Sequence, residues 1–314
     1  MTLLYYDPIF LEHDTGSHPE NAGRLNAVLE RMKKSGLDGK CVQATWQPAT
    51  EEQILNVHSA EMVEVSKTLS QQGGGRIDAD TVCSEESFDA ALKAAGAATD
   101  AVRRVMAGDD KTAFCMVRPP GHHAVPDRAM GFCLLNNVAV GARSAIKDLG
   151  LNKVLIVDWD VHHGNGTQDV FWEDPSVAFL SMHRYPFYPG SGEADEIGTG
   201  RGKGTTVNVP IRYGTSRQTQ INRFRKAVEE LADKVKPEII MISAGFDSHV
   251  NDPIGSLDLE SEDFATLTEI VQGVADTHAQ GRIVSMLEGG YNPAALAESV
   301  EIHLEKLQHP GVDQ

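Results

Sequence analysis

The chain has 314 residues, which is enough for one large α/β domain with a substantial buried core. Hydrophobic residues make up 41% and charged residues 23%, proportions that are ordinary for a soluble globular protein. The formal net charge of -17 argues against a nucleic-acid-binding function, which needs a basic face, and is better explained by an acidic surface that aids solubility.

Short apolar runs alternate with amphipathic stretches along most of the chain. Most runs lack the polar alternation of a half-exposed strand, so we expect buried strands of a parallel sheet at Ala113–Val117, Val154–Val157, Val177–Ser181, Thr206–Ile211, Ile239–Ser243 and Ile283–Leu287. Helical spacing of apolar residues predicts helices at Asn136–Leu149, Gln218–Val235, Ser261–Gln280 and Pro293–Leu307. This alternation predicts a three-layer helix–sheet–helix α/β fold with a mainly parallel sheet.

Nothing in the sequence divides the chain, so we expect one catalytic domain over residues 1–314. The glycine-rich segments Gly73–Gly75 and Gly190–Gly204 are interpreted as surface loops. The N-terminus lacks the features of a signal peptide, and no stretch approaches the roughly 18 apolar residues of a membrane helix. The four scattered cysteines form no CxxC pair, which argues against a cysteine zinc site. Cys115 and Cys133 lie in apolar runs and are expected to be buried thiols, and a reducing, cytoplasmic compartment is the default expectation.

The first polar cluster follows the expected strand Ala113–Val117 and contains His122 and His123 after two prolines. Ligands of parallel α/β sheets bind beyond the carboxyl ends of the strands, so this position is informative. The prolines stiffen the loop, and neutral histidine is the usual general base near pH 7. Taken alone, paired histidines would more often be further metal ligands or ordinary loop residues.

The second cluster follows Val154–Val157 and places Asp158, Asp160 and His162 at alternate positions. In an extended segment such side chains point the same way, and neighbouring carboxylates are costly to bury without a cation. Aspartate oxygen and histidine nitrogen are both good zinc ligands. A solvated loop is the alternative, but the very apolar strand before it favours a metal site.

Two further clusters follow the last two expected strands. Asp247 alone would read as a turn residue, but with Asp160 and His162 it completes a set of three ligands, which is typical of catalytic zinc with one open position. Tyr291 presents a hydroxyl donor after a Gly-Gly pair that lets the backbone approach a ligand, although a tyrosine before Asn-Pro is usually only a helix-start residue.

Taken together, six strings resemble the histone deacetylase family, which includes bacterial acetylpolyamine amidohydrolases and acetoin-utilisation proteins. In chain order they are HDTGSHPENAGRL, RPPGHHA, GFCLLNN, DWDVHHGNGT, AGFDSHVNDP and EGGYNP. The resemblance runs from about His13 to about Pro293. It implies the arginase–deacetylase fold and a zinc-dependent amidohydrolase that removes acetyl or similar acyl groups from amines.

The resemblance assigns the reaction centre residue by residue. It implies one zinc ion per chain on Asp160, His162 and Asp247, and a catalytic pair at His122 and His123.

The remaining catalytic roles concern the residues that support this pair. Tyr291 matches the tyrosine that polarises the scissile carbonyl, next to substrate-binding Gly289 and Gly290. Asp158 matches an acid that orients the first histidine. Asn165 stands where some members have a second acid; an amide cannot stabilise a positive charge, so the second histidine should stay neutral and act as a base.

The resemblance also implies a substrate channel and a second cation. Gly131, Phe132 and Tyr188 match the narrow acyl-lysine channel, while Asp80 and Arg24 match a substrate-backbone acceptor and an inner-channel arginine. Tyr188 is a phenylalanine in many members. A monovalent-cation site, usually potassium, is implied at Asp158, Asp160, His162, Ser181 and Met182.

The substrate class depends on the segment after the third zinc ligand. Members that prefer acetylpolyamines tend to place an acid where this chain has Ile254, and an apolar residue gives no partner to a distal ammonium. An acylated lysine peptide is therefore expected over an acetylpolyamine or another small acylamine.

Two other readings stay open at this stage. A binuclear ureohydrolase would need further bridging carboxylates, and a non-catalytic scaffold would typically lack the tyrosine. Zinc or ferrous iron as the metal, and a homo-oligomeric state, also stay open.

Overall fold

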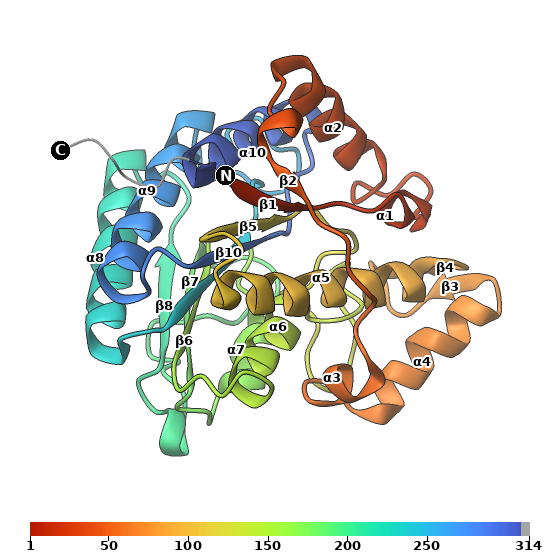
Figure 1. Cartoon of the computed structure of the whole chain (residues 1–314), viewed down its shortest axis with the longest axis horizontal. Helices are drawn as coiled ribbons and strands as arrows, with labels where there is room; N and C mark the ends of the chain where they lie inside the picture. The colour runs from red at the N-terminus through yellow and green to blue at the C-terminus, as the bar shows by residue number, and fades with distance from the viewer. Residues whose placement is uncertain (309–314) are drawn as a thin grey trace.

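The computed structural model describes residues 1–308 and centres on an eight-stranded sheet (Figure 1). The strand order is β2-β1-β5-β10-β9-β6-β7-β8, and every neighbouring pair runs parallel. The strands are β1 Thr2–Tyr5, β2 Val42–Gln43, β5 Thr112–Cys115, β6 Val154–Asp158, β7 Val177–Arg184, β8 Thr206–Ile211, β9 Ile239–Ala244 and β10 Ile283–Leu287. The expected α/β fold class with a mainly parallel sheet is confirmed.

Helices cover both faces of the sheet, as the continuous burial of its central strands requires. In Figure 1, α8, α9, α10 and α2 form one layer, and α5, α6 and α7 lie on the opposite side. The helices are α1 Ile9–Glu12, α2 Gly23–Ser35, α3 Glu51–Leu55, α4 Ala60–Gln71, α5 Ser87–Ala107, α6 Asn137–Lys147, α7 Asn165–Phe171, α8 Arg217–Val235, α9 Ser261–His278 and α10 Pro293–Gln308, with short 3-10 turns η1 Asp38–Lys40 and η2 Gly200–Gly202.

The six expected strands are all present, with end-point shifts that have physical causes. The strand expected at Val177–Ser181 continues to Arg184, because its last residues pair with Pro210 and Ile211 of β8. The strand expected at Ala113–Val117 ends at Cys115, where its pairing with β10 stops. The four expected helices are also present.

The N-terminal third contains elements that the sequence did not predict, including strands β1 and β2 at one end of the sheet and a peripheral hairpin. The hairpin pairs β3 Gly74–Arg76 with β4 Val82–Ser84, so the interpretation of Gly73–Gly75 as a loop was wrong for most of that segment. Gly74 has φ of +97°, and a Cβ there would collide with the backbone of β4, so close strand approach explains this glycine.

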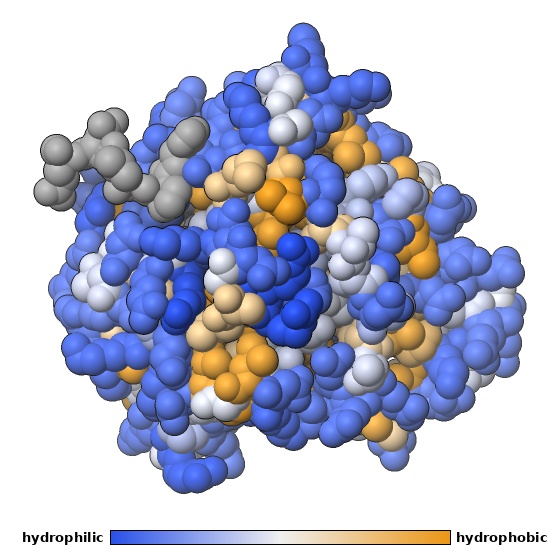
Figure 2. Space-filling view, viewed as in Figure 1, coloured by the Kyte–Doolittle hydropathy of each residue, from blue (hydrophilic) through white to orange (hydrophobic). Residues whose placement is uncertain are grey.

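The surface is largely polar, as expected for a chain in which 23% of the residues are charged. Figure 2 shows a face that is mostly hydrophilic, with small separate hydrophobic patches. Among the described residues, no helix combines the length and apolar character needed to cross a bilayer. The thiols of Cys115 and Cys133 are buried and free, as predicted.

Candidate metal centre and catalytic site

Four adjacent strands, β5, β10, β9 and β6, carry the polar clusters at their carboxyl ends. Because parallel strands end on the same side, the loops that follow them meet at one edge of the sheet. Those loops contain the tandem histidines, Tyr291, Asp247 and the Asp160–His162 segment. The fold therefore assembles in space what the sequence separates by more than a hundred residues.

Asp160, His162 and Asp247 form a compact buried cluster. One ligand atom from each lies within 4.8 Å of the others. The Nδ1 atom of His162 is 3.0 Å from Asp160 Oδ1 and 3.1 Å from Asp247 Oδ2. Asp247 Oδ2 is buried, and despite its short distance to His162 Nδ1 it makes no hydrogen bond of acceptable geometry.

The chemistry of this cluster fits a divalent cation. Burial, together with the negative charge of Asp160, raises the pKa of Asp247 to about 7. A carboxylate in this position needs a positive partner, and an ion would supply one. Glycines surround the cluster: a Cβ on Gly289 would lie 2.6 Å from Asp160 Oδ2, and one on Gly245 would collide with the same carboxylate. Two oxygen ligands and one nitrogen ligand within 4.8 Å of one another match zinc held by three protein ligands.

The local conformation after β6 differs from the extended segment that the alternating spacing suggested. The strand ends at Asp158, and the next turns are fixed by carboxylates that accept backbone N–H groups: Asp158 Oδ1 from Asp160, and Asp160 Oδ1 from His162. The expectation that Asp158, Asp160 and His162 lie on one side of an extended segment was therefore wrong. Asp158 lies against His122, whereas Asp160 and His162 group with Asp247.

The two tandem histidines lie side by side with different partners. Their ring centroids are 4.0 Å apart. His122 Nδ1 is 2.9 Å from Asp158 Oδ2, whereas His123 Nδ1 is 2.7 Å from Asn165 Oδ1, an acceptor that carries no charge. The tautomer that donates from Nδ1 of His123 leaves its Nε2 as an acceptor.

These partners set opposite protonation states. Burial acts to lower the pKa of His122, but the charges of Asp158 and Asp160 outweigh it and raise the pKa well above the ordinary value. Burial lowers the pKa of His123 well below its ordinary value, and the nearby charges of His122 and His162 lower it further. Of the tandem pair, His122 therefore favours the charged form and His123 the neutral form.

Tyr291 is buried beside the metal cluster. Its backbone N–H donates to Asp252 Oδ2 at 2.6 Å, and the Arg24 guanidinium carbon lies 5.1 Å from its ring centroid. Burial and the charge of Asp247 raise the pKa of the Tyr291 hydroxyl well above 10. The phenol consequently remains protonated and available as a donor.

Aromatic side chains surround the approach to the cluster. Phe132 meets Tyr291 edge-on at 5.7 Å between ring centroids, and Tyr188, 37% exposed, meets His123 edge-on at 5.2 Å. Phe187, which the sequence did not single out, stacks on His162 at 5.2 Å and 15°. The walls near the metal cluster are thus built from three rings rather than two.

Backbone geometry fixes the channel residues. Gly131 and Phe132 have φ of +57° and +70°, and the His123 ring packs against Gly131 so closely that a Cβ would collide. The Phe132 N–H donates to Thr81 Oγ1 at 3.2 Å, and Thr81 donates to Asp80 Oδ1 at 3.0 Å. The structure therefore places Asp80 next to the channel.

Ile254 and the residues of the expected second cation site lie in different parts of the fold. The half-buried Ile254 lies in the loop after β9, where its N–H donates to Asp252 Oδ1 at 2.9 Å. Asp158 and Ser181 face each other across β6 and β7, and Ser181 Oγ is 2.9 Å from His183 Nδ1.

Glu288, a fully buried carboxyl group, was not predicted from the sequence as a residue of the site. It accepts the backbone N–H groups of Gly121 at 2.7 Å and His122 at 3.2 Å, and the Ser243 hydroxyl at 3.0 Å. Its own carbonyl oxygen accepts from Arg24. An acid directly after an apolar strand was a visible signal, since Asp158 has the same placement.

Comparison with known proteins identifies the family. The family model of the histone deacetylase domain matches residues 18–307. The chain belongs to the histone deacetylase family. A probable deacetylase of Archaeoglobus fulgidus is 39% identical over 93% of this chain and 82% of its own length. A histone deacetylase-like amidohydrolase of Pseudomonas aeruginosa is 35% identical over the same shares, 93% and 82%.

A solved structure of a family member agrees with the fold. The HD domain of HDA15 superposes with a TM-score of 0.93 at 36% identity, covering 99% of this chain and 90% of that one. The expected family, fold and enzyme class, a deacetylase that hydrolyses amide bonds, are confirmed.

Proposed function

We propose that this chain is a zinc-dependent deacylase that removes acetyl or other short acyl groups from lysine side chains of peptides or proteins. The observation that carries the proposal is the placement of His123, whose ring centroid lies 5.7 Å from that of His162, and of the buried Tyr291 next to the Asp160–His162–Asp247 cluster. A general base, a donor for an oxyanion and a metal site are the groups that amide hydrolysis needs.

The residues divide the work of hydrolysis. A bound zinc ion would polarise the acyl carbonyl and activate a water molecule. His123 Nε2 accepts a proton as the water oxygen attacks the carbonyl carbon. The Tyr291 hydroxyl donates to the carbonyl oxygen as negative charge develops, an interaction worth on the order of 3 kcal/mol. When the C–N bond breaks, His123 returns the proton to the amine, and acetate and a free amine leave.

The channel fits an aliphatic stem. Phe132 and Tyr188 would contact the methylenes of an acyl-lysine side chain, and such burial contributes roughly 0.8 kcal/mol per methylene. Asp80 would accept the backbone N–H of a peptide substrate; its contact with Thr81, which in turn binds the Phe132 N–H, supports this role.

A fixed cation near the gatekeeper supports a peptide rather than a polyamine. Arg184 Nη1 donates to the carbonyl of Gly255, the residue after Ile254, at 3.0 Å. Its guanidinium carbon lies 4.3 Å from the Phe187 ring centroid and 4.8 Å from that of Tyr213. A polyamine would bring its distal ammonium toward this positive charge and an apolar gatekeeper, and both disfavour it.

The rival activity of a binuclear ureohydrolase lacks support at the metal cluster. His249, two residues after Asp247, uses Nδ1 to accept from Asn251 and places Nε2 3.3 Å from Ser261 Oγ. Within residues 1–308, the cluster of Asp160, His162 and Asp247 is the only group of that kind. We therefore propose one zinc ion per chain. We also propose that a potassium ion binds at the Asp158–Ser181 position and that the protein resides in the cytoplasm.

Exchanging the gatekeeper tests the substrate class. We expect wild type to deacetylate acetyl-lysine peptides with a higher kcat/KM than acetylspermidine, and Ile254→Glu to raise the polyamine-to-peptide ratio at least tenfold, because the new carboxylate pairs with the ammonium. Ile254→Gln is the control, with similar size and no charge. Faster wild-type turnover of acetylspermidine than of every acyl-lysine peptide would contradict the proposal.

A further inference from the structure

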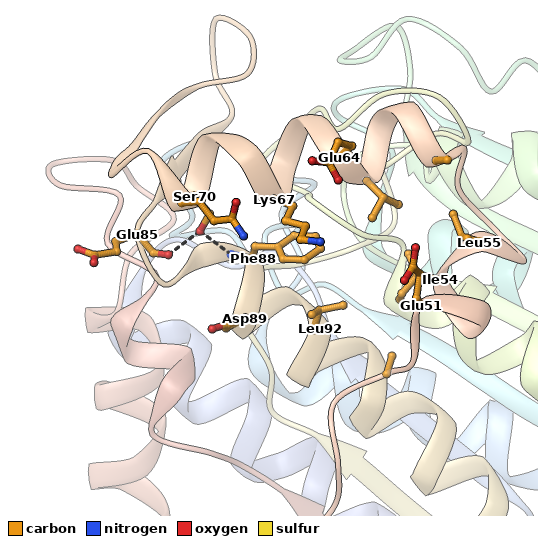
Figure 3. Close-up of a pocket in the computed structure, with 14 residues that line it drawn as sticks. Glu51, Ile54, Leu55, Glu64, Lys67, Ser70, Glu85, Phe88, Asp89 and Leu92 are labelled. Carbon is orange, nitrogen blue, oxygen red and sulfur yellow. Dashed lines mark hydrogen bonds between the residues drawn. The ribbon is translucent and has the colours of Figure 1, made fainter.

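A cavity that is separate from the metal cluster lies between the peripheral helices α3 and α4 and the start of α5 (Figure 3). Its volume is about 550 Å³, within the range of roughly 300–1,000 Å³ that is usual for small-molecule sites. None of its lining residues belongs to the catalytic site described above.

The floor of this α3–α4–α5 pocket is apolar. Ile54, Val63 and Phe88 are buried beneath it, and Leu92 is partly covered. Leu55 is 42% exposed at the rim. Apolar surface left accessible in a concave site gains free energy when a ligand covers it, by about 25 cal/mol per Å².

The rim of the pocket is acidic. Carboxylates come from all three helices: Glu51 on α3, Glu64 on α4 and Asp89 on α5, whereas the carboxylate of Glu85, before α5, points away from the pocket (Figure 3). Lys67 is the single basic lining residue.

These charges are not neutralised within the protein. In residues 1–308, no ion pair within 4.0 Å involves Lys67 or any of the three rim carboxylates, although many other charged groups are paired. The formal charge around the opening is therefore −2, from three acids and one lysine. Such a potential attracts cations and repels anions.

From this combination we propose that the α3–α4–α5 pocket binds aliphatic ammonium compounds, with the alkyl stem on the floor and the ammonium group among the rim carboxylates. The apolar floor excludes small inorganic cations as the best ligands, because they would leave it uncovered. The acidic rim excludes fatty acids, because they would bring like charge to it. Walls on three sides and the volume favour a small molecule over a flat protein surface.

Calorimetric titration of the zinc-loaded protein tests the proposal, with the catalytic channel blocked by a saturating hydroxamate inhibitor. The probes are n-octylammonium, 1-octanol and octanoate, which share the stem and differ in charge. We expect one saturable site per chain for octylammonium, and at least fivefold weaker binding of octanol and octanoate.

Variants locate the site. Leu55→Lys, at an exposed rim position, and the double variant Glu64→Gln/Asp89→Asn should each weaken octylammonium binding at least fivefold. Glu61→Gln is the matched control, because Glu61 is an exposed acid on the same helix and does not line the pocket. Absence of saturable binding, equal affinity for octanoate, or unchanged binding in both pocket variants would overturn the proposal. These experiments measure binding and not catalysis, so a negative result would not affect the proposed deacylase function.

Discussion

At the scale of single residues, the site depends on neighbours that set the charge of each catalytic group. His122 and His123 are identical side chains with rings 4.0 Å apart, yet a carboxylate faces one and an amide faces the other. The carboxylates raise the pKa of His122, whereas burial and the neighbouring histidine charges lower that of His123. Asp158 and Asn165 therefore matter to the chemistry without contacting the substrate.

Removal of the Tyr291 hydroxyl should separate chemistry from binding. Tyr291→Phe should lower kcat by roughly a hundredfold or more, because the oxyanion loses its donor. The ring contacts with Phe132 and Arg24 remain, so zinc content and the melting temperature should stay close to wild type. Steady-state kinetics on an acetyl-lysine peptide measures the loss, and near-normal kcat would exclude Tyr291 as the polarising donor.

At the scale of elements, Glu288 joins three loops that follow different strands. Its carboxylate contacts the Gly121–His122 backbone after β5 and Ser243 near the end of β9, while the residue itself follows β10. The catalytic histidines are thus positioned by an acid that is remote in sequence.

Truncation of this acid should disturb catalysis through geometry. Glu288→Ala leaves two buried N–H groups without an acceptor, at about 1–3 kcal/mol each, and should lower kcat tenfold or more with little change in KM. Glu288→Gln keeps an acceptor and should recover most of the activity. The kinetic constants and melting temperatures of both variants check this; full kcat in a folded Glu288→Ala protein would refute a positioning role.

The secondary-structure elements also differ in how well the sequence predicts them. Strands β5 to β10 were predictable because most of them are continuous apolar runs, and the metal ligands because each follows such a run. The two-residue strand β2 is too short to show a pattern, and the many alanines of α5 weaken its apolar contrast. Phe187 and Arg184 were missed because their roles depend on contacts made only after folding.

At the scale of the whole molecule, the buried histidines should control acid stability. Burial lowers the pKa of five histidines to about 3–4, and none of them is a proposed metal ligand: His13, His58, His163, His183 and His303. Because their pKa in the unfolded chain is near 6.5, the unfolded state binds more protons below that pH. Stability is therefore complete above pH 6.5 and is lost as pH falls toward 4.

Urea unfolding between pH 7 and pH 5 measures this loss. Each histidine contributes up to about 1.4 kcal/mol per pH unit. Within the site, raised pKa values of Glu288 and Asp247 (both to about 7), Asp158, His122 and His162 act in the opposite direction, but the five histidines together with His123, whose pKa burial also lowers, outnumber these groups. The free energy of unfolding should decrease over this range, before most carboxyl groups of the unfolded chain titrate. A constant or rising value would contradict the account.

The most direct test of the central claim is the metal content of Asp247→Ala. Asp247 Oδ2 is a buried carboxylate oxygen without a hydrogen bond, beside Asp160 and His162. If these three side chains hold the catalytic ion, elemental analysis should find one zinc per chain in wild type and in the exposed-acid control Asp276→Ala. Asp247→Ala should contain almost none and be inactive. Full zinc occupancy in folded Asp247→Ala would contradict the proposed site.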